Sequence, residues 1–307
     1  MQPLTGIALK LCSVLMFISM ASLIKATSDH VPAGQAVFFR SLFAVPVILA
    51  WLTIRGDLRT GLRVKSPMAH FWRGFVGTAA MGMMFAGLGL LPLPEVTALG
   101  YAAPLLTVVF AAMFLGETVG VFRLASVALG LSGVLIILAP RLTLLSEETV
   151  QMAQAVGAVL TLMGAVCAAL AQIYIRKLVQ SEQTSAIVFY FSLTSTLLSL
   201  LTLPFGWVLP APREALLLIV AGLLGGMGQI FLTSAYRFAG ASVVAPFDYA
   251  SMVFALLIGY FIFAETPTTQ MLLGAAIVIA AGVLIILREG HLGLKRSKAR
   301  SGITPQG

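Results

Sequence analysis

Long apolar stretches follow one another along almost the whole chain. A helix needs about 20 apolar residues to cross a hydrocarbon core of about 30 Å. Ten such segments can be delimited, at about residues 5–24, 34–54, 72–91, 94–115, 119–138, 155–175, 185–203, 214–235, 241–263 and 268–287. Only 10% of the residues are charged, whereas a soluble domain carries about 25%. The sequence therefore predicts an all-α integral membrane protein with ten transmembrane helices.

Basic residues are unevenly distributed between the two sides of such a protein. If the N-terminus is cytoplasmic, most of the 19 Lys and Arg residues, Arg73 among them, fall in loops and helix ends on the cytoplasmic side. The outer loops then contain only Lys25, Arg141 and Arg213. The positive-inside rule therefore predicts cytoplasmic termini. The net charge of +8 reflects this bias and a basic tail, which we expect to lie near anionic lipid rather than nucleic acid.

Short strings recur in the same order in the two halves of the chain. VFFRSL is echoed by VFYFSL, GVLIIL occurs twice, and a longer pair of segments shares a Tyr-Ala start and a Glu-Thr end. The matching segments are 37–42 with 188–193, 133–138 with 282–287, and 100–118 with 248–266. Because the offset between the copies stays at 148 to 151 residues, an internal duplication is indicated, with five helices in each half.

Five is an odd number, so the second half must enter the membrane from the opposite side. We expect a first five-helix repeat over 1–140, an outer linker over 141–154, a second, inverted repeat over 155–288, and a cytoplasmic tail over 289–307. Inverted repeats are a recurrent architecture of secondary transporters, which bind solute near the midplane between the halves. A larger, purely structural membrane protein is the alternative.

Four charged residues fall within the predicted membrane helices: Lys10, Arg40, Glu95 and Asp248. Such charges are costly in a bilayer and usually functional. Their depths predict two pairs, Arg40 with Glu95 and Lys10 with Asp248. Lys10 is also long enough to snorkel to water, and Glu95 suits a helix N-terminus. Asp248, which replaces Gly100 of the first repeat, is our first candidate, because a carboxylate can hold a cation, exchange a proton or accept a hydrogen bond.

Two amides and two tyrosines complete the set of candidate site residues. Gln172 and Gln229 lie on polar stripes of their helices, and an amide exposed to lipid is costly. Tyr101 and Tyr249 occupy equivalent positions in the two repeats. Each ring either lines a central cavity or packs in the core with its hydroxyl hydrogen-bonded.

Signatures of enzymes and of ATP-driven pumps are missing from the sequence. It contains no Walker-type Gly-x-x-x-x-Gly-Lys run. Its three histidines are scattered over loops and the tail, without the spacing of metal ligands. Cys12 and Cys167 lie within predicted helices and are expected to be packing residues. We therefore expect no catalytic residues, no metal site and no cofactor.

The duplicated five-helix unit, with its FLGET and YFIFAET ends followed by GVLIIL, resembles the EamA family of drug/metabolite transporters over about residues 5–288. The resemblance implies ten helices, cytoplasmic termini, a central cavity between the halves and movement of small metabolites without ATP. It also implies that the third, fourth, eighth and ninth helices form the cavity walls. Tyr101, Gln229, Asp248 and Tyr249 lie on these helices.

Several strings are similar to the bacterial riboflavin-transporting branch of that family: VFFRSLFAVP (37–46), LPLPEVTALGYAAPLL (91–106), IVFYFSL (187–193) and TLPFGWVLP (202–210). This resemblance implies a permease of the bacterial inner membrane that takes up riboflavin by alternating access. Export of amino acids or drugs is the alternative within the family, and a non-transporting or lipid-handling protein is the alternative outside it. The expected partners are the small solute and the lipid bilayer, and a homodimer is one option for assembly.

Overall fold

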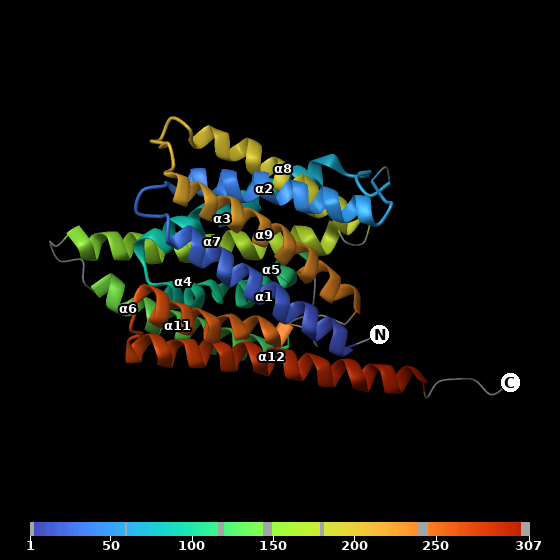
Figure 1. The fold of residues 1–307 in the computed structure, drawn as a ribbon. Helices are drawn as coiled ribbons and strands as arrows, with labels where there is room; N and C mark the ends of the chain where they lie inside the picture. The colour runs from blue at the N-terminus through green and yellow to red at the C-terminus, as the bar shows by residue number, and fades with distance from the viewer. Residues whose placement is uncertain are drawn as a thin grey trace.

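The computed structural model describes residues 3–58, 60–115, 120–143, 149–178, 181–238 and 245–301, and within these ranges it contains helices and no strands. The helices lie alongside one another in a layered bundle (Figure 1). They are α1 (Pro3–Lys25), α2 (Ala33–Ile54), α3 (Pro67–Leu90), α4 (Leu93–Gly100), α5 (Ala102–Leu115), α6 (Val121–Thr143), α7 (Thr149–Leu178), α8 (Thr184–Ser199), α9 (Pro212–Phe238), α11 (Ala250–Phe263) and α12 (Thr269–Ser301), with short 3-10 helices η1 (Leu200–Thr202) and η2 (Ala245–Tyr249).

Ten membrane-crossing units can be assembled from these elements, as predicted. The fourth is α4 followed by α5, and the ninth is η2 followed by α11. Eight of the described spans are long and apolar enough to cross a membrane on composition alone, and the segment Phe247–Phe263 is a shorter apolar helix. The third unit, α3, which contains Arg73 and several glycines, is not one of these eight spans.

Two features of the predicted helices were wrong: the start of the third helix and the continuity of the fourth. The third helix was expected to begin near residue 72, but α3 begins at Pro67, which occupies one of its first two positions. Arg73 is therefore inside the helix and not at its end. The fourth helix was expected to be continuous, but it is broken at Tyr101. Pro104 explains the break, because it has no N–H to donate to the carbonyl of Gly100.

The packing of the helices follows the symmetry of two inverted repeats. If α1 corresponds to α7, and α3 to α9, then the contact of α1 with α9 is equivalent to that of α3 with α7. These are the two most extensive helix contacts. The units that correspond to each other also pack together: α6 on α12, α2 on α8, and α4 on α11. A duplicated five-helix unit inserted in opposite directions explains this pattern.

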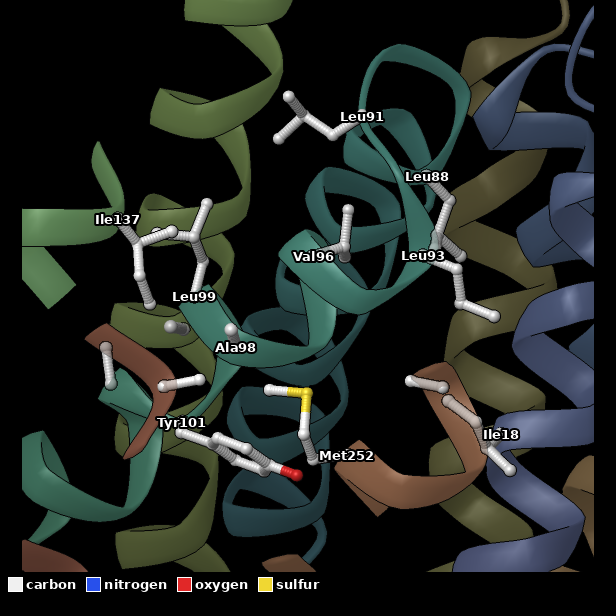
Figure 2. Packing of buried hydrophobic residues seen from close by; sticks show 14 of the residues in the cluster. Ile18, Leu88, Leu91, Leu93, Val96, Ala98, Leu99, Tyr101, Ile137 and Met252 are labelled. Atoms are coloured by element: carbon white, nitrogen blue, oxygen red, sulfur yellow. The ribbon is translucent and has the colours of Figure 1, made fainter. Parts of the chain in front are cut away.

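The short helix α4 lies within the largest cluster of buried hydrophobic side chains (Figure 2). Leu93, Ala98 and Leu99 of this helix are completely buried. Figure 2 also places Tyr101, at the end of α4, beside Met252 of α11. The core of the bundle is thus centred on the broken fourth unit and its counterpart from the second repeat.

Both termini emerge at the same end of the bundle, on the right of Figure 1. We call this the terminal end, and the opposite one the far end. An even number of crossings requires this arrangement. At the terminal end α12 continues past the bundle to Ser301 (Figure 1).

Two glycines bring α6 and α12 into backbone contact. A Cβ added at Gly133 would lie 2.8 Å from the carbonyl oxygen of Gly274, and one added at Gly274 would lie 2.6 Å from the carbonyl oxygen of Gly133. Neither contact can be relieved by turning a side chain, because both partner atoms belong to the backbone. Small residues at such crossings permit close helix association in membranes.

We expect Gly133→Ala to destabilise the protein by about 1–3 kcal/mol, the usual cost of overpacking a tight contact. The measurement is thermal or denaturant unfolding of the purified protein in detergent. Gly82→Ala in α3 is the matched control, because a Cβ there would meet nothing within 4 Å. Equal stability of the two variants would contradict the prediction.

Candidate functional site

The two helix breaks meet at the interface between the repeats. Tyr101 and Tyr249 follow α4 and end η2, and their ring centroids lie 5.0 Å apart in an edge-to-face arrangement. Both side chains are buried. The Tyr101 hydroxyl lies 2.6 Å from the Ser251 hydroxyl, which donates to the Asp248 carbonyl oxygen at 2.7 Å. Equivalent residues of the two repeats therefore contact each other directly, and their polar contacts lead to Asp248.

Gly282 makes room for Tyr249. A Cβ at this position would overlap the Tyr249 hydroxyl. Gly282 is the first residue of the second GVLIIL string. One of the recurring strings thus has a direct structural role next to the helix break.

Asp248 forms an ion pair with Lys10 across the two repeats. Lys10 Nζ, on α1, lies 2.6 Å from Asp248 Oδ1. The predicted pairing of these two residues is therefore present. The Lys10 side chain is only 2% exposed, whereas that of Asp248 is 42% exposed. Lys10 does not snorkel to the surface, and its charge is held inside the bundle beside a carboxylate that remains accessible.

The other predicted pair does not form. No ion pair among the described residues joins Arg40 to Glu95, and Arg40 Nε and Nη1 have no hydrogen-bond partner. Glu95 is buried in the first turn of α4, with interactions of its own. Depth in the membrane suggested the pair, but depth does not determine which way a side chain points around its helix.

Arg40 instead lies near a second buried arginine that the sequence analysis had assigned to a cytoplasmic helix end. Arg73 Cζ lies 3.7 Å, and Arg40 Cζ 5.6 Å, from the ring centroid of Phe191 on α8. Pro67 was the signal that would have placed Arg73 inside the membrane, because proline is favoured at the first position of a helix.

The two candidate glutamines lie in different environments. Gln229 on α9 is half-buried and makes interactions with its surroundings. Gln172 on α7 is exposed. The structure therefore brings Lys10, Asp248, Tyr101 and Tyr249 together through described contacts, and it leaves Gln172 on the outside of the bundle.

A second ion pair joins the repeats at the far end. Ala264 adopts a left-handed backbone conformation after α11, and the next residue, Glu265, turns toward the first repeat. Glu265 Oε1 lies 2.9 Å from Lys25 Nζ at the end of α1, and its Oε2 accepts a hydrogen bond from the Leu93 N–H of α4. Glu265 belongs to the Glu-Thr end that recurs in the two halves, and its counterpart in the first repeat, Glu117, lies outside the described residues.

Lys25 is fully engaged in this far-end contact. Besides Glu265, its ammonium group donates to the carbonyl oxygens of Leu88 and Leu91 at the end of α3, at 3.1 and 2.7 Å. The side chains of Lys25 and Glu265 are each only 14% exposed. We call the contacts of Lys25 with Glu265, Leu88 and Leu91 the far-end latch, because they fasten α1, α3 and α11 to one another.

Glu182 organises the loop before α3 at the terminal end. Its Oε1 accepts hydrogen bonds from the backbone N–H groups of Lys65 and Ser66, both at 2.8 Å, and its Oε2 lies 3.8 Å from His70 Nε2. These contacts tie the start of α3 to the start of α8. Within the described ranges, no cluster of three or more His, Cys, Asp or Glu side chains is arranged to hold a metal ion.

A membrane bundle of two inverted repeats, with a charged pair beside broken helices at their interface, defines a membrane transporter. The model of the EamA-like transporter family matches residues 4–139 and 155–288, and the chain belongs to this family. The expected family is thereby confirmed. Each match covers one half of the chain.

Similar proteins are named as transporters of different solutes. The pseudopaline exporter CntI of Pseudomonas aeruginosa (strain UCBPP-PA14) is 32% identical over 297 residues, which cover 96% of this chain and 97% of the relative. An S-adenosylmethionine uptake transporter of Rickettsia felis is 27% identical over 286 residues, which cover 93% and 94%. Neither name mentions riboflavin.

A solved structure shares the fold. It is described only as a crystal structure of a protein, and it superimposes with a TM-score of 0.66 at 20% identity, covering 94% of this chain and 98% of the other. At this identity the similarity establishes the architecture and says nothing of the solute.

Proposed function

We propose that this EamA-family transporter moves a small charged metabolite by alternating access, and that solute or coupling ion engages Asp248. The observation that supports the proposal is the ion pair between buried Lys10 and accessible Asp248, next to the contact of the two helix breaks. Ionisable residues inside a membrane bundle mark substrate or ion pathways. Sites at discontinuous helices between repeats are typical of secondary transporters.

The two ends of the bundle differ in a way that suits alternating access. The far-end latch closes the repeats on one side. On the other side, Asp248 is accessible although its partner is buried. A cationic group of the solute, or a proton, competes with Lys10 for the Asp248 carboxylate. We further propose that the terminal end faces the cytoplasm of a bacterium, because the positive-inside rule favours this orientation.

The names of relatives guide the choice of solutes to test. They include an exporter of pseudopaline and an importer of S-adenosylmethionine, so neither the solute nor the direction is common to them. Riboflavin has no support from these names, and S-adenosylmethionine takes its place as the first solute of the test. Its sulfonium and amino groups are cations of the kind that a carboxylate holds.

We expect proteoliposomes that contain only this protein to accumulate or exchange labelled S-adenosylmethionine above the level of empty vesicles. Riboflavin and a set of amino acids are measured in parallel, with the solute placed on either side of the membrane. Exchange without net uptake is informative, because it requires a solute site that faces each side in turn. Failure with every solute, combined with transfer of lipid between leaflets, would support a lipid-handling protein instead.

A further inference from the structure

Two arginine side chains converge inside the bundle. Arg40 comes from α2, Arg73 comes from α3, and both guanidinium groups lie near the ring of Phe191 on α8. Because both guanidinium carbons lie within 5.6 Å of the centroid of this one ring, their positive charges repel each other. The carboxylate of Asp248 belongs to a different place, because it contacts Lys10. The arginine pair is therefore separate from the ion pair described above.

The pair is buried without a compensating negative charge among the described ion pairs. Arg40 is 2% and Arg73 is 6% exposed. Among the described residues, Nε and Nη1 of both arginines have no hydrogen-bond partner, and neither arginine belongs to any of the four described ion pairs. Arginine does not escape the cost by losing its proton. Two such cations cost several kcal/mol each unless an anion joins them.

The helices around the pair provide space for these guanidinium groups. A Cβ at Gly77 of α3 would lie 2.6 Å from Arg73 Nη1, and a Cβ at Gly225 of α9 would lie 2.9 Å from Arg40 Nε. The face of the Arg73 guanidinium is covered by the Phe191 ring at 3.7 Å, in a cation–π contact. The guanidinium groups are thus positioned by glycines and an aromatic ring, and their Nε and Nη1 groups donate no hydrogen bond within the described residues.

We propose that Arg40 and Arg73 form a binding site for the carboxylate of the transported solute. Guanidinium groups match the planar geometry of a carboxylate and bind it through two parallel hydrogen bonds. The identification of the carboxylate as part of the solute rests on the proposed transport function. The depth of burial argues against a lipid headgroup, which must stay connected to its acyl chains in the bilayer.

The position of Arg40 relative to Asp248 fits a solute with charges at both ends. A Cβ at Gly225 would contact both Arg40 Nε and Met20 Sδ, so the Arg40 guanidinium lies beside Met20 on α1. Met20 is ten residues from Lys10 on the same helix, or about 15 Å along its axis. A carboxylate at the arginine pair therefore leaves the other end of an elongated solute free to place a cation near Asp248.

The test measures carboxylate binding by the purified full-length protein in detergent, without transport. The probes are S-adenosylmethionine, its decarboxylated analogue, L-methionine and benzoate, with chloride and inorganic phosphate at equal ionic strength. We expect at least one carboxylate to bind and to raise the unfolding temperature, and the decarboxylated analogue to bind at least about tenfold more weakly than S-adenosylmethionine if the latter binds. No response to any carboxylate, or equal responses to chloride, would overturn the proposal.

Variants distinguish a binding role from a structural one. Arg40→Gln and Arg73→Gln should abolish the carboxylate response and leave the protein at least as stable as the wild type without ligand, because each removes a buried unpaired charge. Arg55→Gln, in an exposed position, is the control and should respond normally. Gly77→Ala keeps both charges but displaces Arg73 Nη1, and should weaken binding, whereas Gly82→Ala should not. Normal carboxylate binding by both arginine variants would refute the site.

The outcomes separate this proposal from the transport function. If the wild type and Arg40→Gln transport a solute at equal rates, and neither protein binds a carboxylate, the binding site is refuted and the transport function is not. Carboxylate binding that depends on both arginines, in a protein that transports nothing, would refute the function and leave an anion site in the bundle.

Discussion

Asp248→Asn should reduce transport at least about tenfold, because it removes the charge that competes for a cationic group or a proton at a site where intramembrane carboxylates usually act. The substitution keeps the size of the side chain and leaves an oxygen able to accept from Lys10. Initial rates in proteoliposomes, normalised to folded protein, measure the effect. If a proton is exchanged at this carboxylate, the pH dependence of transport should disappear together with the charge.

Two further variants decide whether Asp248 is needed for function or only to neutralise Lys10. Asp57→Asn, the same substitution in an exposed connection, should transport normally. In the double variant Lys10→Met with Asp248→Asn, no buried charge is left without a partner, so a purely structural pair predicts recovery of transport. A functional carboxylate predicts that transport remains low. Wild-type rates and an unchanged pH profile in Asp248→Asn would refute its role.

Breaking the far-end latch should shift the bundle toward a state that is open at the far end. Glu265→Gln removes the ion pair with Lys25 and weakens the hydrogen bond from the Leu93 N–H. A hydrogen bond to a charged group contributes about 1.5–3 kcal/mol, and each 1.4 kcal/mol changes a population about tenfold. The open state should therefore become about ten- to a hundredfold more populated.

A cysteine introduced at Ala98, which is completely buried in α4, reports on this opening in a background in which Cys12 and Cys167 are replaced by serine. Its labelling by a membrane-impermeant thiol reagent from the far side should accelerate in Glu265→Gln. Glu214→Gln is the matched control, because Glu214 pairs with His30 and is 21% exposed. Labelling at the wild-type rate in Glu265→Gln would show that the latch does not hold this end closed.

The number of helices followed from the sequence because it depends on hydropathy, and the orientation inferred from the basic residues stays a prediction. The pairing of Lys10 with Asp248 could also be predicted, since both lie at similar depth on one side of the membrane. The same reasoning failed for Arg40 and Glu95. Depth alone does not determine the direction in which a side chain points from its helix. That direction depends on how the helix packs against its neighbours.

The residues that sequence reasoning missed depend on tertiary contacts or on a helix boundary. Glu265 ends a helix in the sequence, but its contacts with Lys25 and Leu93 join segments far apart in the chain. Arg73 was misplaced by an error of a few residues at a helix start. The break at Tyr101 was detectable in principle, since Pro104 lies four residues after Gly100, but proline in a membrane helix does not always interrupt it.

The direct contact of Tyr101 with Tyr249 places the local pseudo-twofold axis between two corresponding residues. In a transporter made of two identical repeats, the conformations open to opposite sides would have equal free energies, because exchanging the repeats would convert one into the other. Gly100 and Asp248 precede these tyrosines and are corresponding residues of the two repeats. Because they differ, the two repeats are not equivalent next to this axis. Under the proposed alternating access, a resting preference for one side of the membrane would arise from the divergence of the two copies, and restoring identity at this position would bring the free energies of the two conformations closer together.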